Sequence, residues 1–189
     1  MTALVPTLST RYFPRTAAWL RDLLLITISA LFVAALAQVR IPLPFTPVPL
    51  TGQTFAVLLV GAALGSKRGA ASLALYTLMG AVGLPFFAGG ASGLAYMSGP
   101  TLGYLVGFVI AAYVMGLLAE RGLERSVRTS LVPFLAGTLV IYLFGAVWLA
   151  VLLGVEQALT LGVLPFLVGD AIKLVLAALA LPAAWRLVN

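Results

Sequence analysis

The chain has 189 residues, of which 62% are hydrophobic and only 8% are charged, with a net charge of +6 and neither cysteine nor histidine. An ordinary soluble domain carries roughly a quarter charged residues, so this composition excludes a soluble globular fold and predicts a single membrane domain over residues 1–189. Disulfides, thiol chemistry and the commonest metal ligand are excluded as well. The basic residues stand near the ends of apolar segments, which indicates membrane topology rather than nucleic-acid binding.

The first 21 residues are polar and basic, and they predict a cytoplasmic segment that precedes a helical bundle over residues 22–187. The apolar run at 23–39 predicts the first membrane span. A basic leader, an apolar segment and Ala-Leu-Ala at 35–37 also resemble a signal peptide with a small-residue cleavage site. Processing of residues 1–37 is therefore an alternative, although the chain that follows is itself multi-spanning.

A proline-rich segment separates the first two predicted helices. Residues 41–52, IPLPFTPVPLTG, hold four prolines and cannot form a regular helix. The helix predicted at 53–64 is short for a complete span, so part of the proline segment is expected to fold back into the membrane. A basic pair at 67–68 ends this helix, and the third helix is predicted at 69–84.

The remaining elements alternate between apolar runs and loops of contrasting character. Residues 85–100, PFFAGGASGLAYMSGP, are rich in glycine and carry no charge, whereas residues 120–129 form a hydrophilic loop. The fourth, fifth and sixth helices are predicted at 101–119, 131–153 and 162–187. Together the segments predict an all-α integral membrane protein, a bundle of six transmembrane helices.

The basic residues orient this bundle. Cytoplasmic loops of membrane proteins are enriched in lysine and arginine. With six spans, the two termini and the loops at 67–68 and 120–129 share one side and hold nine basic residues, whereas the other side holds Arg40 alone. Both termini are therefore predicted to be cytoplasmic. The nine are Arg11, Arg15, Arg21, Lys67, Arg68, Arg121, Arg125, Arg128 and Arg186.

Two ionisable residues, Asp170 and Lys173, stand inside the apolar run of the sixth predicted helix. Their spacing of three places them on one helical face. A single charge in the bilayer is costly, so the two are expected to pair. A structural ion pair remains one interpretation. The other is a polar binding site that opens outward, because Asp170 lies in the outer third of this helix.

The glycine-rich segment at 85–100 is a second candidate for ligand contact. Glycine lets backbone groups approach a ligand closely, and an uncharged loop between two spans fits a lid over a cavity as well as a plain connection. Tyr76, Tyr96 and Tyr104 could supply aromatic walls, although tyrosine is also common at membrane interfaces.

The sequence argues against enzymatic activity and against energy from nucleotides. The segment GAALGSKRG at 61–69 lacks the Gly-Lys-Ser/Thr order of a phosphate-binding loop. No histidine cluster, carboxylate pair or serine motif indicates an active site or a metal site. Energy for any active transport would therefore enter through another subunit.

Three stretches carry a resemblance to a known family: residues 41–90, SGPTLGYLVGF at 98–108 and GDAIK at 169–173. They resemble the BioY proteins, the biotin-specific substrate-binding subunits of energy-coupling factor transporters, over about residues 23–187. This resemblance implies six helices, capture of biotin on the outer face of the cytoplasmic membrane, and no cofactor. It also implies two kinds of partner, a transmembrane coupling subunit and two ATPase subunits.

The resemblance implies roles for individual residues. Asp170 and Lys173 would hold the ureido ring, the carboxylate accepting its N–H groups and the ammonium donating to its carbonyl. Loop contacts are implied for Gly89, Gly90 and Ser92. Some relatives use an asparagine near the third helix, which this chain lacks. The polar set must therefore differ, and the replacements considered are Gln53, Tyr76, Tyr104 and backbone groups.

Small residues recur at four-residue spacing and permit close helix contact. They include the series at Gly61, Gly65 and Gly69 and the pair Ala30 and Ala34. Packing within the bundle is one interpretation. The family resemblance instead implies that Ala30 and Ala34 form a docking surface for the coupling subunit. A solitary carrier or channel for a small organic solute, and an intramembrane enzyme or assembly factor, are the functional alternatives.

Overall fold

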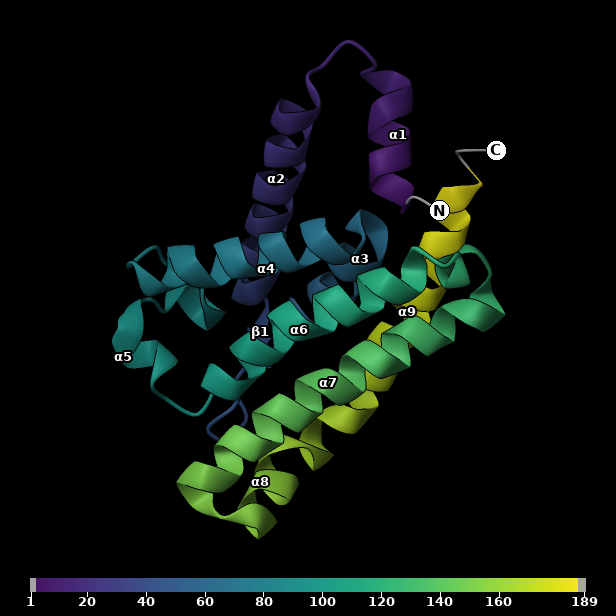
Figure 1. Cartoon of the computed structure of the whole chain (residues 1–189). Coiled ribbons are helices and arrows are strands. Elements are labelled where there is room, and N and C mark those ends of the chain that lie inside the picture. Colours follow the sequence, from purple (N-terminus) through teal and green to yellow (C-terminus); the bar gives the residue numbers. More distant parts are fainter. Residues whose placement is uncertain (1–2, 187–189) are drawn as a thin grey trace.

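A computed structural model describes residues 3–186, which are mostly helical (Figure 1). The longer helices are α2 (Ala18–Gln38), α3 (Gln53–Leu64), α4 (Ser66–Ala81), α6 (Leu102–Ala119), α7 (Val127–Leu153) and α9 (Leu167–Trp185). Three short helices are α1 (Leu4–Tyr12), α5 (Gly93–Met97) and α8 (Val155–Gly162), and the 3-10 turns are η1 (Ala88–Gly90), η2 (Leu123–Arg125) and η3 (Leu164–Phe166). The proline segment is flanked by two short antiparallel strands, β1 (Arg40–Ile41) and β2 (Leu50–Thr51).

Four helical stretches of the described chain are long and apolar enough to cross a membrane: Ala18–Gln38, Leu102–Ala119, Val127–Leu153 and the combined α8–α9 stretch Val155–Trp185. Helices α3 and α4 have 12 and 16 residues, which is less than the ~20 that a perpendicular span needs. The all-α membrane fold agrees with the prediction. The count of six spans and the side on which the termini lie stay predictions.

The observed helix bounds differ from the predicted ones at several places, and α2 and α7 begin five and four residues earlier than predicted. Residues 4–12, predicted only as a polar segment, form α1, whose Leu4 and Pro6 are buried. The third helix begins at Ser66 and ends at Ala81, three residues earlier at each end than predicted. The sixth predicted helix is interrupted, because the chain leaves α8 at Gly162 and turns through η3 before α9 begins. Its predicted end at Leu187 lies outside the described residues.

Helix α6 occupies the centre of the bundle and packs against α3, α4 and α7. Glycines make these contacts close. A Cβ on Gly61 would lie 2.8 Å from Cα of Ala112, and a Cβ on Gly103 would lie 2.3 Å from the carbonyl oxygen of Phe144. These small residues therefore serve packing within the bundle, one of the two interpretations of their spacing.

Ala30 and Ala34 face the interior of the chain. Their exposed fractions are 0% and 5%, and α2 packs on α3 and α4. This burial favours packing within the chain in this conformation. Their role as a partner interface stays a prediction.

The turn between α3 and α4 is held by a carboxylate from α6. Oε1 of Glu120 accepts hydrogen bonds from the backbone N–H of Ser66 at 2.8 Å and from its hydroxyl at 2.9 Å. Gly65 adopts a φ of +85° there, and a Cβ at this position would lie 2.6 Å from Oε1. Glycine is thus needed for both conformation and space.

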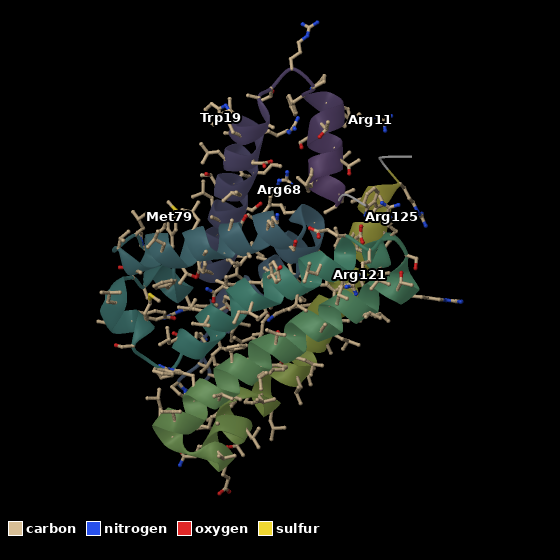
Figure 2. All side chains as sticks on the ribbon, in the orientation of Figure 1. Arg11, Trp19, Arg68, Met79, Arg121 and Arg125 are labelled. Carbon is tan, nitrogen blue, oxygen red and sulfur yellow. The ribbon has the colours of Figure 1, made fainter. Side chains whose placement is uncertain are left out.

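Charged side chains gather at one end of the bundle. Arg11, Arg68, Arg121 and Arg125 lie in the half of the molecule that holds α1 and the end of α9 (Figure 2). Helices α5 and α8 lie toward the opposite end (Figure 1). This separation matches the uneven distribution of basic residues in the sequence.

Candidate ligand-binding site

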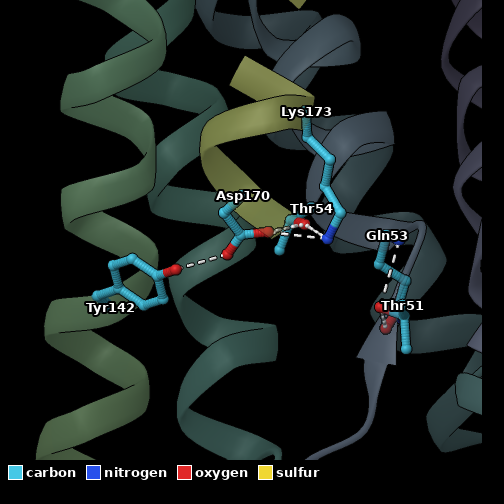
Figure 3. Close-up of polar contacts among 6 residues, drawn as sticks. All are labelled: Thr51, Gln53, Thr54, Tyr142, Asp170 and Lys173. Carbon is cyan, nitrogen blue, oxygen red and sulfur yellow. Dashed lines mark hydrogen bonds and ion pairs between the residues drawn. The ribbon is translucent and has the colours of Figure 1, made fainter. Parts of the chain in front are cut away.

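The two ionisable residues of α9 meet polar side chains from α3 and α7 (Figure 3). Nζ of Lys173 lies 2.8 Å from Oδ1 of Asp170, so the expected pairing is confirmed. The hydroxyl of Thr54, in the first turn of α3, donates to the same Oδ1 at 2.9 Å and accepts from Lys173 at 2.8 Å. The hydroxyl of Tyr142, on α7, donates to Oδ2 of Asp170 at 2.6 Å. One small network therefore joins three helices.

Both charges of this network are largely removed from solvent. The side chain of Asp170 is 8% exposed and that of Lys173 is 16% exposed. Burial of a lone carboxylate or ammonium would be costly, and pairing with extra hydrogen bonds offsets much of that cost. The pair is electrically neutral as a whole. It nevertheless presents a strong acceptor and a strong donor side by side.

The network forms part of the wall of a cavity of about 540 Å³, its open mouth included. The proline segment and helices α3, α6, α7 and α9 all contribute to the wall. Most of the lining is apolar, with Leu105, Phe108, Ile141 and Phe166 among its members. A ligand with an apolar body and one polar end would match such a cavity.

Four of the predicted site residues, Asp170, Lys173, Gln53 and Tyr104, line this cavity. The hydroxyl of Tyr104 donates to the carbonyl of Gly162 at 2.6 Å and so ties α6 to α8. Nε2 of Gln53 donates to the hydroxyl of Tyr76 in a short hydrogen bond. Tyr76 is completely buried and does not line the cavity. It therefore holds the Gln53 side chain without contacting the cavity itself.

The loop residues Gly89, Gly90 and Ser92 do not line the cavity, whereas Ala88 and Tyr96 of the same segment do. Gly89 and Gly90 instead make a turn, with φ values of +67° and +79°. Phe87 anchors the segment. Its buried ring stacks on Tyr96, with centroids 5.1 Å apart, and meets Tyr76 edge-on at 5.9 Å. The role of this loop as a lid stays a prediction.

Sequence reasoning missed Thr54, Tyr142 and Thr101 as site residues. Tyr142 gave a usable signal, because it stands in the middle of a predicted span, away from the interfaces where tyrosine is common. Thr54 and Thr101 gave none, since a threonine at a helix start is ordinary. Thr101 lines the cavity, and its buried Oγ1 has no hydrogen-bond partner among the described residues.

The chain is similar over nearly its whole length to one family. The family model described as BioY matches residues 7–189. A probable biotin transporter BioY of Pyrococcus horikoshii is 44% identical over 149 residues, covering 78% of this chain and 88% of that protein. The biotin transporter BioY of Rhizobium etli is 40% identical over 169 residues, covering 84% of this chain and 90% of the relative.

A solved structure has the same fold. It is the S-component for biotin from an ECF-type ABC transporter, and it aligns with a TM-score of 0.80 at 26% sequence identity. The alignment covers 88% of this chain and 92% of that chain. The overall helical fold is therefore shared with a protein described as the S-component for biotin.

Proposed function

Because this chain belongs to the BioY family, we propose that it captures biotin in the cavity between α3, α6, α7 and α9 and serves biotin uptake across a membrane. The observation that carries this proposal is the Asp170–Lys173 pair, held at 2.8 Å in the wall of a mostly apolar cavity. The role is that of a binding and transport subunit rather than of an enzyme.

Biotin has chemical groups that complement this cavity. Its ureido ring carries two N–H donors and one carbonyl acceptor, its thioether ring is apolar, and an aliphatic tail ends in a carboxylate. Asp170 accepts from a ureido N–H, and Lys173 donates to the ureido oxygen. Hydrogen bonds that involve a charged group are roughly twice as strong as neutral ones. The apolar wall at Phe108 and Ile141 would contact the thioether ring and the tail.

The hydrogen bonds already present limit how the ureido ring binds. A carboxylate oxygen accepts about two hydrogen bonds. Oδ1 of Asp170 accepts from both Thr54 and Lys173, whereas Oδ2 accepts from Tyr142 alone. One lone pair on Oδ2 therefore remains for a ureido N–H. The second N–H would bind another acceptor in the wall, and the hydroxyl oxygen of Thr101 is one.

The energy for uptake would come from partner proteins. The chain carries no phosphate-binding loop, and the solved structure with the same fold is a component of an ECF-type ABC transporter. The partners we propose are a transmembrane coupling subunit and two ATPase subunits. The compartment would be the cell's cytoplasmic membrane, with the cavity open to the outside.

A titration of the purified chain with biotin in detergent, without nucleotide, tests this proposal. Saturable binding that biotin methyl ester shares, and that an analogue without the ureido carbonyl loses, is expected. Absence of biotin binding by folded protein would refute the proposal. Uptake into vesicles that hold the chain alone would favour the alternative of a solitary carrier.

A further inference from the structure

A groove between α7, α8 and α9 lies behind one wall of the ligand cavity. Two residues, Tyr142 and Asp170, line both the groove and the cavity. The hydroxyl of Tyr142 donates to Oδ2 of Asp170 at 2.6 Å and so joins α7 to α9 (Figure 3). This hydrogen bond is therefore part of a partition, with the ligand cavity on one side and the groove on the other.

The walls of the groove are apolar and regular. Three residues of α7 and three of α9 line it at intervals of four, the spacing that places side chains on one face of a helix. Of the described residues that line it, Asp170 alone is charged, and Lys173 balances that charge from the cavity side. The six regularly spaced residues are Leu135, Leu139, Leu143, Leu167, Ala171 and Val175.

The groove faces the hydrocarbon of a bilayer. Both of its long walls belong to stretches that are long and apolar enough to cross a membrane, Val127–Leu153 and Val155–Trp185. Its α7 wall, from Leu135 to Ala146, lies in the middle of the first stretch, away from both ends. The surrounding medium at this depth is lipid acyl chain rather than water or lipid headgroup.

The length of the groove fits one acyl chain. At a rise of 1.5 Å per residue, the wall from Leu135 to Ala146 extends for about 16 Å. An acyl chain spans one leaflet, which is half of a hydrocarbon core about 30 Å thick, or about 15 Å. Alanine on each helix, Ala146 and Ala171, leaves the space that such a chain would fill.

A chain in this groove would protect the partition. An unfilled apolar groove forfeits dispersion contacts along its walls, and water there would reach the Tyr142–Asp170 hydrogen bond and compete for the remaining lone pair on Oδ2. A hydrocarbon chain fills the space and has no hydrogen-bonding group. It therefore covers the bond without disturbing it.

We propose that the groove binds one acyl chain of a membrane phospholipid, which covers the Tyr142–Asp170 hydrogen bond from the membrane side. The chain is recognised by shape and apolar contact, because no lysine or arginine is among the described residues that line the groove. This inference goes beyond the proposed function and does not depend on it, since it concerns the opposite side of the partition.

The test titrates the delipidated chain in detergent with dioleoyl phosphatidylcholine and counts bound lipids by native mass spectrometry. The wild type should bind one phospholipid saturably, and phosphatidylglycerol with the same chains should bind equally well. Ala171→Trp should weaken this binding at least about tenfold, because the indole would take the place of the acyl chain and its dispersion contacts. Ala180→Trp, at an exposed alanine of α9 outside the groove, is the matched control and should bind like the wild type.

Photolabelling of the wild type in bilayers gives a second measurement, which decides the question even if Ala171→Trp fails to fold. A phospholipid with a diazirine at the end of one acyl chain should label Leu139, Leu143 and Val175 more strongly than Val168 and Leu176, which are exposed outside the groove. Even labelling of all five would identify ordinary bilayer lipid and overturn the inference.

Three other results would also overturn the inference. Tighter binding of phosphatidylglycerol would indicate headgroup recognition, and equal losses in the two tryptophan variants would indicate non-specific binding. Groove residues without any lipid label in bilayers would indicate that a protein segment covers them. None of these measurements involves biotin, so each of these results would leave the proposed function intact.

Discussion

The hydroxyl of Tyr142, on α7, donates to Oδ2 of Asp170, on α9, across 2.6 Å. The other oxygen of the same carboxylate is held by Thr54 and Lys173. Asp170 is therefore fixed from three directions before any ligand arrives, and little rearrangement is needed when a ureido group binds. Preorganisation of this kind raises affinity by lowering the cost of ordering the site.

Tyr142→Phe should weaken biotin binding by about tenfold. The change removes one hydrogen bond to a charged group, which contributes about 1.5–3 kcal/mol, and leaves Oδ2 free to accept a second ureido N–H as partial compensation. Titration in detergent measures the affinity. Tyr113→Phe, at an exposed tyrosine of α6, is the control. Unchanged affinity in Tyr142→Phe would show that Asp170 is positioned without this bond.

Asp170→Asn and Lys173→Met should each weaken binding much more strongly. Loss of one partner of a buried, hydrogen-bonded charge pair costs about 2–5 kcal/mol, or roughly 30-fold to several thousand-fold in affinity. The melting temperature of each variant must be recorded together with its dissociation constant. Near-normal affinity in both folded variants, combined with lower melting temperatures, would identify a purely structural ion pair.

Ala34→Leu should destabilise the chain by about 1–3 kcal/mol, because a larger side chain would be forced into a packed interior. Ala35→Leu is the matched control on the same helix, since Ala35 is exposed. It should leave the melting temperature unchanged. If Ala34→Leu melted like the wild type but failed to assemble with a coupling subunit, the alanine would face a partner after all, contrary to its burial here.

Glu124→Gln should increase the free energy of unfolding of the chain, and this increase should be larger at higher pH. Glu124 is completely buried at η2, both carboxylate oxygens lack hydrogen-bond partners among residues 3–186, and Nε of Arg125 is 4.0 Å away. Burial raises the pKa of Glu124, partly offset by Arg125. The folded state therefore holds this proton more tightly than the unfolded state. The free energy of unfolding of the wild-type chain therefore falls as the pH rises above the ordinary glutamate pKa of about 4.3. It levels off above the raised pKa of Glu124.

Melting temperatures at pH 5, 6.5 and 8 check this prediction. A rise of a few degrees at pH 8, about what 1 kcal/mol produces in a chain of this size, should shrink toward pH 5. Glu156→Gln, at an exposed glutamate, is the control. If the increase in melting temperature were the same at all three pH values, the charge of Glu124 would not be the cause of the increase.

Single cysteines should report the topology directly, because the chain has no native cysteine. Cysteines that replace Ser92 and Glu156 should react with a membrane-impermeant reagent added outside intact cells, whereas those that replace Lys67 and Arg125 should be protected. The reason is the excess of basic residues on one side. Any one of the four on the opposite side would contradict the six-span arrangement.

The bounds of a helix were predicted well where prolines, glycines or charged residues flank the apolar segment. Residues 53–64 follow four prolines and precede a basic pair, and residues 101–119 lie between a glycine-proline pair and a charged loop. Both segments were predicted within one residue of the observed helices. Helix α1 escaped prediction, because nine residues of mixed apolar and polar character give little periodic signal.

The ion pair of the site was predictable because it is local, a matter of spacing within one helix. Its other partners were not. The hydrogen bond from Thr54 to Asp170 joins residues 116 positions apart, and no local pattern encodes such a contact. The burial of Ala30 could not be predicted from the sequence either. Small residues at four-residue spacing give the same pattern whether they pack against their own chain or against a partner.

Helix α3 has 12 residues, so it rises only about 18 Å, whereas the hydrocarbon core of a bilayer is about 30 Å thick. During synthesis it could not be retained in the membrane as an independent hydrophobic segment. It would have to be inserted together with α4 as a helical hairpin. The backbone N–H at the tip of that hairpin is bound by Glu120, which the ribosome adds 54 residues after Ser66. This hydrogen bond can therefore form only after α6 has been made.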